Sequence, residues 1–200
     1  MEKELASPTK KKTSLKIIKV TKTLFEKQGI EATTISQIAA KCEITRRTVY
    51  DHFINKDEIV YAILKEYFEE LYDIDFTKIT SKNKIIRLKQ LLHLILDRYL
   101  DNPVIMKFII NYYQLNPSKL SIEDEIFTKI RGLSALLDFI TPYKNERKIP
   151  IETIEIVFHF ILGIGMRFAL RSNSFLGFYT DISKEALHRS LDKLMLSFND

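Results

Sequence analysis

Residues 33–53, TTISQIAAKCEITRRTVYDHF, constrain the fold of this chain more than any other segment. Apolar residues recur there at the spacing of one face of a short helix, namely Ile35, Ile38, Ala39 and Cys42. Thr33 or Thr34 is placed to cap the N-terminus of that helix, because a threonine hydroxyl can accept a hydrogen bond from a free backbone N–H. The pattern therefore predicts a helix of about two turns, with Cys42 as a buried thiol.

A second short helix is predicted directly after a tight connection at Ile44. Thr45 can cap it, and Val49 and Phe53 point inward. Its polar side chains stay outside: Arg46, Arg47, Thr48, Tyr50 and His52. Two short helices joined by a tight turn, the second carrying long polar side chains, are typical of a helix-turn-helix that inserts its second helix into the major groove. The segment therefore predicts binding to double-stranded DNA.

The same region resembles the DNA-binding signature of the TetR family of bacterial transcriptional regulators. The matching residues, in order, are Leu24, Phe25, Gly29, Ala32, Thr33, Thr34, Ile35, Ile38, Ala39, Ile44, Thr45, Thr48, Tyr50, His52, Phe53, Lys56 and Asp57. The chain departs at Glu43 and Arg47, where the family commonly has glycine. A left-handed Glu43 costs on the order of 1 kcal/mol, which a packed domain can absorb. Arg47 adds a guanidinium, so the operator sequence of a relative cannot be transferred to this chain.

Two groups of DNA contacts are predicted from their positions in the motif. Side chains at the start of the second helix can reach base edges, where arginine binds guanine in a bidentate fork; these are Thr45, Arg46 and Arg47. The side chains predicted to contact phosphate, which fixes register without reading sequence, are Thr33, Thr34, Thr48, Tyr50, His52 and Lys56. For Tyr50, core packing is the alternative.

Charge and cysteine content agree with an intracellular DNA-binding protein. Residues 1–56 hold twelve lysines and arginines and six acidic residues, a net charge of +6, whereas the whole chain has +5. The positive charge is therefore concentrated beside the motif. A single cysteine excludes an internal disulfide framework, and the N-terminus has no apolar stretch of a signal peptide, so a cytoplasmic location is predicted. The apolar segment 156–170 is too short for a membrane span and carries His159 and Arg167.

Helical periodicity continues to the end of the chain, and the sequence predicts an all-α protein of about nine helices. Beyond the first three, helices are expected from Lys56 with Asn55 as its cap, over 85–100, over about 103–115, from Ser121 to Thr141 and Pro142, over 151–171, and from Ser183. The predicted organisation is a helix-turn-helix domain at residues 1–55 and an effector-binding and dimerisation bundle at residues 56–200.

The last two helices are predicted to form a homodimer, because helix 151–171 is apolar nearly all round. The candidate interface residues are Gly163, Gly165, Leu191 and Leu194, with intramolecular packing as the alternative for the glycines. The family resemblance implies the same dimer.

The resemblance further implies a repressor that releases a palindromic operator when a small apolar or amphiphilic effector binds in the bundle. Candidate pocket residues are His93, Tyr112, Tyr113, His159 and Arg167, although polar residues of this kind also occur in ordinary cores. The alternative is a helix-turn-helix protein whose bundle docks a protein partner. No catalytic constellation, metal-ligand spacing or cofactor motif is found, so neither an enzyme, a metal site nor a cofactor is expected.

Overall fold

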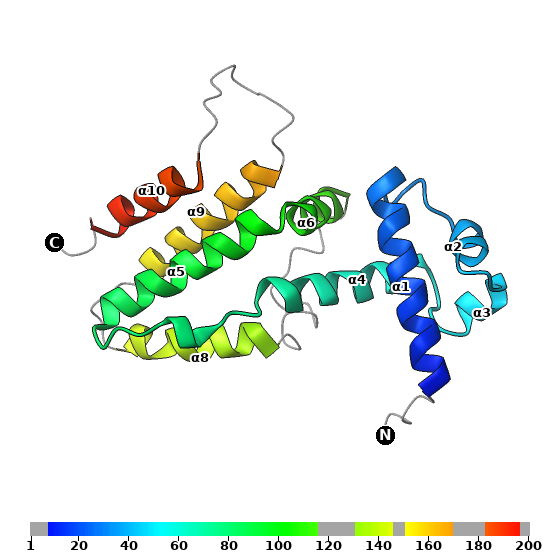
Figure 1. Cartoon of the computed structure of the whole chain (residues 1–200), viewed down its shortest axis with the longest axis horizontal. Coiled ribbons are helices and arrows are strands. Elements are labelled where there is room, and N and C mark those ends of the chain that lie inside the picture. Colours follow the sequence, from blue (N-terminus) through cyan, green and yellow to red (C-terminus); the bar gives the residue numbers. More distant parts are fainter. Residues whose placement is uncertain (1–7, 116–130, 146–150, 170–182, 197–200) are drawn as a thin grey trace, which may run out of the picture. The chain divides into compact units, whose positions relative to one another are not determined.

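A computed structural model describes residues 8–115, 131–145, 151–169 and 183–196 of the chain. The regular secondary structure of these ranges is helical: nine α-helices and one short 3-10 turn (Figure 1). The predicted all-α fold is therefore confirmed. The helices form two compact units, one up to Tyr67 and one from Phe68 onward. The division lies within the fourth helix, and the predicted functional boundary between residues 55 and 56 stays a prediction.

The first unit contains helices α1 (Pro8–Gln28), α2 (Ile35–Lys41), α3 (Arg46–Tyr50) and most of α4 (Lys56–Leu71). Figure 1 shows α2 and α3 next to each other, with α1 beside α2. Apolar side chains from all four helices form its core, including Ile17, Phe25, Ile38, Val49, Ile59 and Ile63. Cys42 is fully buried among them, as predicted, and this burial raises the pKa of its thiol.

Helix α4 is joined to this unit by a cap and an ion pair. Asn55 Oδ1 accepts a hydrogen bond from the backbone N–H of Glu58 at 2.9 Å, which confirms the predicted cap. Further along the helix, Lys22 Nζ of α1 lies 2.7 Å from Glu66 and 4.3 Å from the centroid of the Tyr67 ring. The salt bridge and the cation–π contact therefore hold Lys22 of α1 against one face of α4.

The second unit contains the 3-10 turn Phe76–Lys78 and helices α5 (Lys84–Asp101), α6 (Pro103–Leu115), α8 (Arg131–Asn145), α9 (Ile151–Ala169) and α10 (Lys184–Leu196). Helix α9 packs along α5 and α6, and α10 packs on α5 (Figure 1). Apolar α5 residues at helical spacing fill the centre, among them Leu88, Leu91, Leu92, Ile95, Leu96 and Tyr99. No helix among the described residues is both long enough and apolar enough to cross a bilayer.

Two glycines allow close packing in the second unit. A Cβ added at Gly165 of α9 would lie 2.8 Å from Cβ of Tyr99, and one added at Gly132 of α8 would overlap the backbone carbonyl of Tyr72. The Tyr72 and Tyr99 hydroxyls lie 3.4 Å apart, and burial raises the pKa of both phenols. The glycines thus let α8 and α9 approach a pair of tyrosines whose hydroxyl groups are buried.

One predicted helix end is wrong. The sequence predicts that a helix stops at Thr141 and Pro142, but α8 continues through Pro142 to Asn145. A proline inside a helix removes one N–H hydrogen bond and its ring crowds the carbonyl four residues earlier. The preceding apolar face of α8 nevertheless continues to pack, with Leu136 and Ile140 buried. The predicted start of this helix, at Ser121, lies outside the described residues.

Candidate DNA interface

The N-terminus of α2 is built as a capping box. Thr34 has extended backbone angles, and its Oγ1 accepts a hydrogen bond from the backbone N–H of Gln37 at 3.3 Å. In return, Gln37 Oε1 accepts from the Thr34 backbone N–H at 2.8 Å. The two residues satisfy each other's free backbone donors, so Thr34 is the cap. Its exposed side chain also lies at a helix N-terminus, which attracts phosphate.

Replacing Thr34 with alanine should lower the free energy of unfolding by about 1 kcal/mol, because the N–H of Gln37 would lose its acceptor. Urea unfolding of the purified protein measures this loss. Thr34→Ser, which keeps the hydroxyl, is the matched control and should remain close to wild type. Equal losses for the serine and alanine variants would contradict a capping role.

The turn between α2 and α3 uses a strained residue. Glu43 has a φ of +55°, as its position in the motif predicts. Its backbone N–H donates to the carbonyl of Ala40 at 3.1 Å, and the N–H of Ile44 donates to that of Ala39 at 3.0 Å. These two bonds close the end of α2, and the tight turn brings α3 against α2.

Helix α3 presents the predicted base-reading residues at its first turn. Thr45 caps it, since its Oγ1 accepts from the backbone N–H of Thr48 at 3.0 Å and lies 2.9 Å from Thr48 Oγ1. Arg46 and Arg47 follow, both exposed. The guanidinium of Arg46 lies 3.5 Å from Ser36 Oγ of α2, so it is tethered to the preceding helix. The arrangement leaves two guanidinium groups at the helix end that enters the major groove in proteins of this type.

Tyr50 and His52 lie at the other end of α3. Tyr50 is 52% exposed, which rules out full core packing for its side chain. His52 is half-buried, and its Nδ1 lies 2.8 Å from Ser14 Oγ of α1. Ser14 therefore orients the imidazole and leaves Nε2 for another partner. Sequence reasoning missed Ser14 because thirty-eight positions separate it from His52 and no local spacing connects them.

Thr33 is not available for the predicted phosphate contact. Its side chain is 1% exposed, and its Oγ1 donates to the Gly29 carbonyl at 2.8 Å and accepts from Gln28 Nε2 at 3.2 Å. The hydroxyl is therefore used to close the connection between α1 and α2. Thr34, one residue later, takes the exposed position.

Lys56 is also engaged within the protein. Its Nζ donates to the backbone carbonyls of Ile30 at 2.9 Å and Thr33 at 3.2 Å. An ammonium has three hydrogens, so one donor is left for a phosphate. The main role visible in the structure is to tie the start of α4 to the connection between α1 and α2. The phosphate contact of Lys56 stays a prediction.

The candidate effector residues do not converge. Tyr112 is buried, whereas His159 and Arg167 are exposed on α9, on its outer side rather than inside the bundle. His93 contacts His188 of α10. The side chain of Tyr113 lies outside the described residues. The four described side chains therefore do not form one cluster around a common space.

Two of the four candidate dimer residues are buried in their own chain, and two are accessible. Gly165 and Leu191 are buried in their own chain, Gly165 against Tyr99, so neither has surface left for a second copy. This corrects their assignment to the interface and supports intramolecular packing for Gly165. Gly163 is exposed, with nothing within 4 Å of an added Cβ, and Leu194 is half-buried. Gly163 and Leu194 remain candidates.

Sequence comparison matches the N-terminal part of the chain to known proteins. Residues 17–63 match the family described as bacterial regulatory proteins, tetR family. The HTH-type transcriptional regulator TtgR of Pseudomonas putida is 39% identical over 57 residues, 28% of this chain and 27% of TtgR. The uncharacterized HTH-type transcriptional regulator TtgW of the same species is 39% identical over 67 residues, 34% of this chain and 49% of TtgW. The chain thus matches about half of TtgW and about a quarter of TtgR.

Solved structures resemble the chain over nearly its whole length. A bacterial regulatory protein in the tetR family from Rhodococcus RHA1 has a TM-score of 0.61 at 20% identity, covering 92% of this chain and 96% of that one. A TetR family transcription regulator from Marinobacter aquaeolei VT8 has a TM-score of 0.59 at 18% identity, covering 94% and 92%. The chain therefore carries a TetR-family DNA-binding domain at residues 17–63 and has the fold of TetR-family regulators.

Proposed function

We propose that this protein is a homodimeric transcriptional regulator that binds a palindromic DNA operator through α3. In this proposal a small apolar or amphiphilic molecule, bound in the C-terminal bundle, releases the operator and thereby relieves repression in the cytoplasm. The observation that carries the proposal is the pair of exposed guanidinium groups, Arg46 and Arg47, at the N-terminus of α3 within a matched DNA-binding domain. A guanidinium in the major groove can bind guanine O6 and N7.

Phosphate contacts would surround this base-reading end. Thr34 lies at the exposed N-terminus of α2, and Tyr50 and His52 lie at the far end of α3. Lys10, Lys11 and Lys12 on α1 are exposed and add positive charge to the same unit. We assign these groups to the phosphate backbone, where they set register and contribute a salt-dependent part of the affinity.

The outer face of α9 supports the proposed dimer. Ile156 is 62% exposed and Phe160 is 41% exposed, and Gly163 continues the same helical face. Exposed apolar residues in one stripe favour burial against another surface. A twofold dimer would present two copies of α3 to half-sites about 34–36 Å apart, which is why a palindromic operator is proposed.

The bundle interior supports an apolar effector. The second unit buries Leu, Ile, Met and Phe side chains around a few polar groups, namely Tyr112 and the paired hydroxyls of Tyr72 and Tyr99. A mostly apolar site with a few polar anchors is typical of small-molecule binding. We therefore propose that the effector binds beside these tyrosines and favours a spacing of the two α3 helices that does not fit DNA.

A compound screen by thermal shift, followed by operator binding, tests this function. Compounds that stabilise the protein should weaken operator binding at least about fivefold, which is the lower end of ordinary allosteric coupling. Tyr99→Phe removes one hydroxyl at nearly constant volume and should reduce the stabilisation by compounds that carry a polar group. Stabilising compounds that never release DNA would contradict the effector role and favour a bundle that docks a protein partner.

A further inference from the structure

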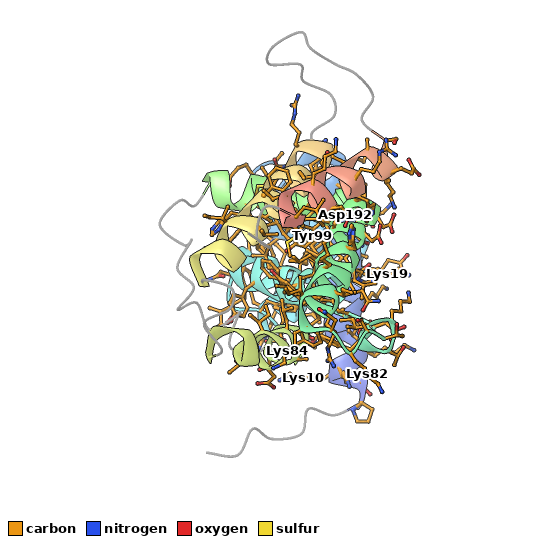
Figure 2. All side chains as sticks on the ribbon, turned by 90° about the vertical axis from the view of Figure 1, so that its left-hand side faces the viewer. Lys10, Lys19, Lys82, Lys84, Tyr99 and Asp192 are labelled. Carbon is orange, nitrogen blue, oxygen red and sulfur yellow. The ribbon has the colours of Figure 1, made fainter. Side chains whose placement is uncertain are left out.

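Two histidines that are far apart in the sequence meet where α10 packs on α5. The rings of His93 and His188 are stacked, with centroids 4.8 Å apart and planes inclined by 22°. Their Nδ1 atoms lie 2.5 Å apart. Each Nε2 lies beside a carboxylate of the opposite helix, His93 at 3.1 Å from Asp192 and His188 at 3.0 Å from Asp97. Figure 2 shows Asp192 on α10 where that helix faces α5.

The hydrogen-bond pattern sets the number of protons on this pair. The hydrogen bond from His93 lowers the pKa of Asp192, so this carboxyl is ionised near neutral pH and can only accept. His188 Nε2 donates in the same way to Asp97. Both Nε2 atoms donate, so the state of the two facing Nδ1 atoms remains to be set. If both Nδ1 atoms were bare, two acceptors would face each other; if both were protonated, two donors would face each other. Only a single proton between them gives one donor and one acceptor.

The charges around the pair lead to the same number. On α5, Lys89 lies 3.5 Å from Asp192, and Asp101 pairs with Lys184 of α10. With both histidines neutral, the side chains joined by these contacts carry two positive charges, on two lysines, and three negative charges, on Asp97, Asp101 and Asp192. Glu185 and Arg189 of α10 add one charge of each sign. Among the described residues, the hydrogen bonds and ion pairs that reach the two rings come from α5 and α10. One added proton on the histidine pair therefore brings the net charge of these contacting side chains to zero.

We propose that His93 and His188 form a one-proton clasp that holds α10 on α5 and makes this attachment depend on pH. A metal ion fits the site less well than a proton. Zinc binds histidine nitrogen at about 2.0–2.1 Å, which in tetrahedral geometry separates two ligand nitrogens by roughly 3.3 Å, more than the spacing here. Among the described residues, no three histidine, cysteine or acidic side chains are placed so that they could hold one metal ion together.

The clasp predicts a maximum in stability as a function of pH. A free histidine has a pKa of about 6.5, so two histidines in the unfolded chain together hold one proton near that pH. Above it the unfolded chain holds fewer protons than the clasp, and stability falls as pH rises. Below it the unfolded chain holds more, and stability falls as pH falls. The contribution of the clasp is therefore greatest near pH 6.5, while its Asp192 stays ionised.

Unfolding of the full chain by urea between pH 5 and pH 9 tests the clasp. The difference in stability between wild type and the double variant His93→Gln, His188→Gln should peak near pH 6.5. Above pH 6.5, the ratio of the variant's unfolding equilibrium constant to that of wild type should fall with pH, and the fall should approach about tenfold per pH unit, the limit for one proton. His159→Gln, which removes a histidine of α9, is the matched control and should keep the peak. A difference curve that is flat, or that rises steadily with pH, would overturn the proposal.

Nuclear magnetic resonance of the wild-type protein tests the clasp directly. It does not depend on whether the histidine variants fold. A single strongly deshielded proton, coupled to Nδ1 of both rings, is expected near pH 6.5. Two separate neutral rings without such a signal would contradict the shared proton. Stoichiometric Zn²⁺ binding that removes both the signal and the pH maximum at equal protein concentration would assign the pair to a metal ion instead.

Discussion

Arg47→Ala should lower affinity for the cognate operator about ten- to a hundredfold and relax base preference at one position of each half-site. The expected loss is about 1–3 kcal/mol, the usual size for a guanidinium that binds a base edge in a bidentate fork. Arg47 is exposed in the first turn of α3, where a helix in the major groove reaches the bases.

Binding is best measured with wild-type operator and with operators carrying single base changes, at one fixed salt concentration. Lys65→Ala is the matched control, because it removes an exposed positive charge of α4 and leaves α3 unchanged. This control should keep the base preference of wild type. If Arg47→Ala kept both the affinity and the base preference, Arg47 would not be a base-reading residue.

The second large effect is expected in the bundle, where Gly165→Ala should destabilise the protein by up to about 2 kcal/mol. A Cβ at this position would lie 2.8 Å from Cβ of Tyr99 and 3.3 Å from Cε of Met106, both in the packed core. Overpacking of a well-filled core commonly costs about 1–3 kcal/mol. The gain in helix propensity from glycine to alanine, about 1 kcal/mol, offsets only part of that cost.

Gly163→Ala is the matched control two residues earlier on the same helix. Nothing lies within 4 Å of its added Cβ, so the substitution should stabilise the isolated chain by about 0.5–1 kcal/mol. Urea unfolding of both variants gives the comparison. Equal effects at the two positions would contradict the rotation of α9 that buries Gly165 and exposes Gly163. A weaker dimer in Gly163→Ala alone would support its place in the dimer face.

Features set by short-range patterns could be predicted from the sequence. The caps at Thr45 and Asn55, and the left-handed Glu43, depend on hydrogen bonds and sterics within a few residues, so local spacing determines them. Burial of Cys42 follows from helical periodicity in the same way. These features place the base-reading end of α3, and the sequence predicted that part of the candidate site.

Other features depend on which side of an element faces its neighbour. Sequence did not decide between Thr33 and Thr34, because the connection after Gly29 turns one hydroxyl inward and the next outward. It did not separate Gly163 from Gly165, because α9 is apolar nearly all round and its rotation is set by Tyr99. The His93–His188 contact joins residues ninety-five positions apart, which no spacing rule connects.

A crystal structure of the full chain bound to DNA selected from a random pool is the most direct measurement of the proposed function. It should show a twofold dimer with α3 of each copy in the major groove and the Arg47 guanidinium within hydrogen-bond distance of a guanine edge. A complex in which α3 lies outside the groove, or in which Arg47 contacts only phosphate, would contradict the assignment of α3 as the element that reads the operator.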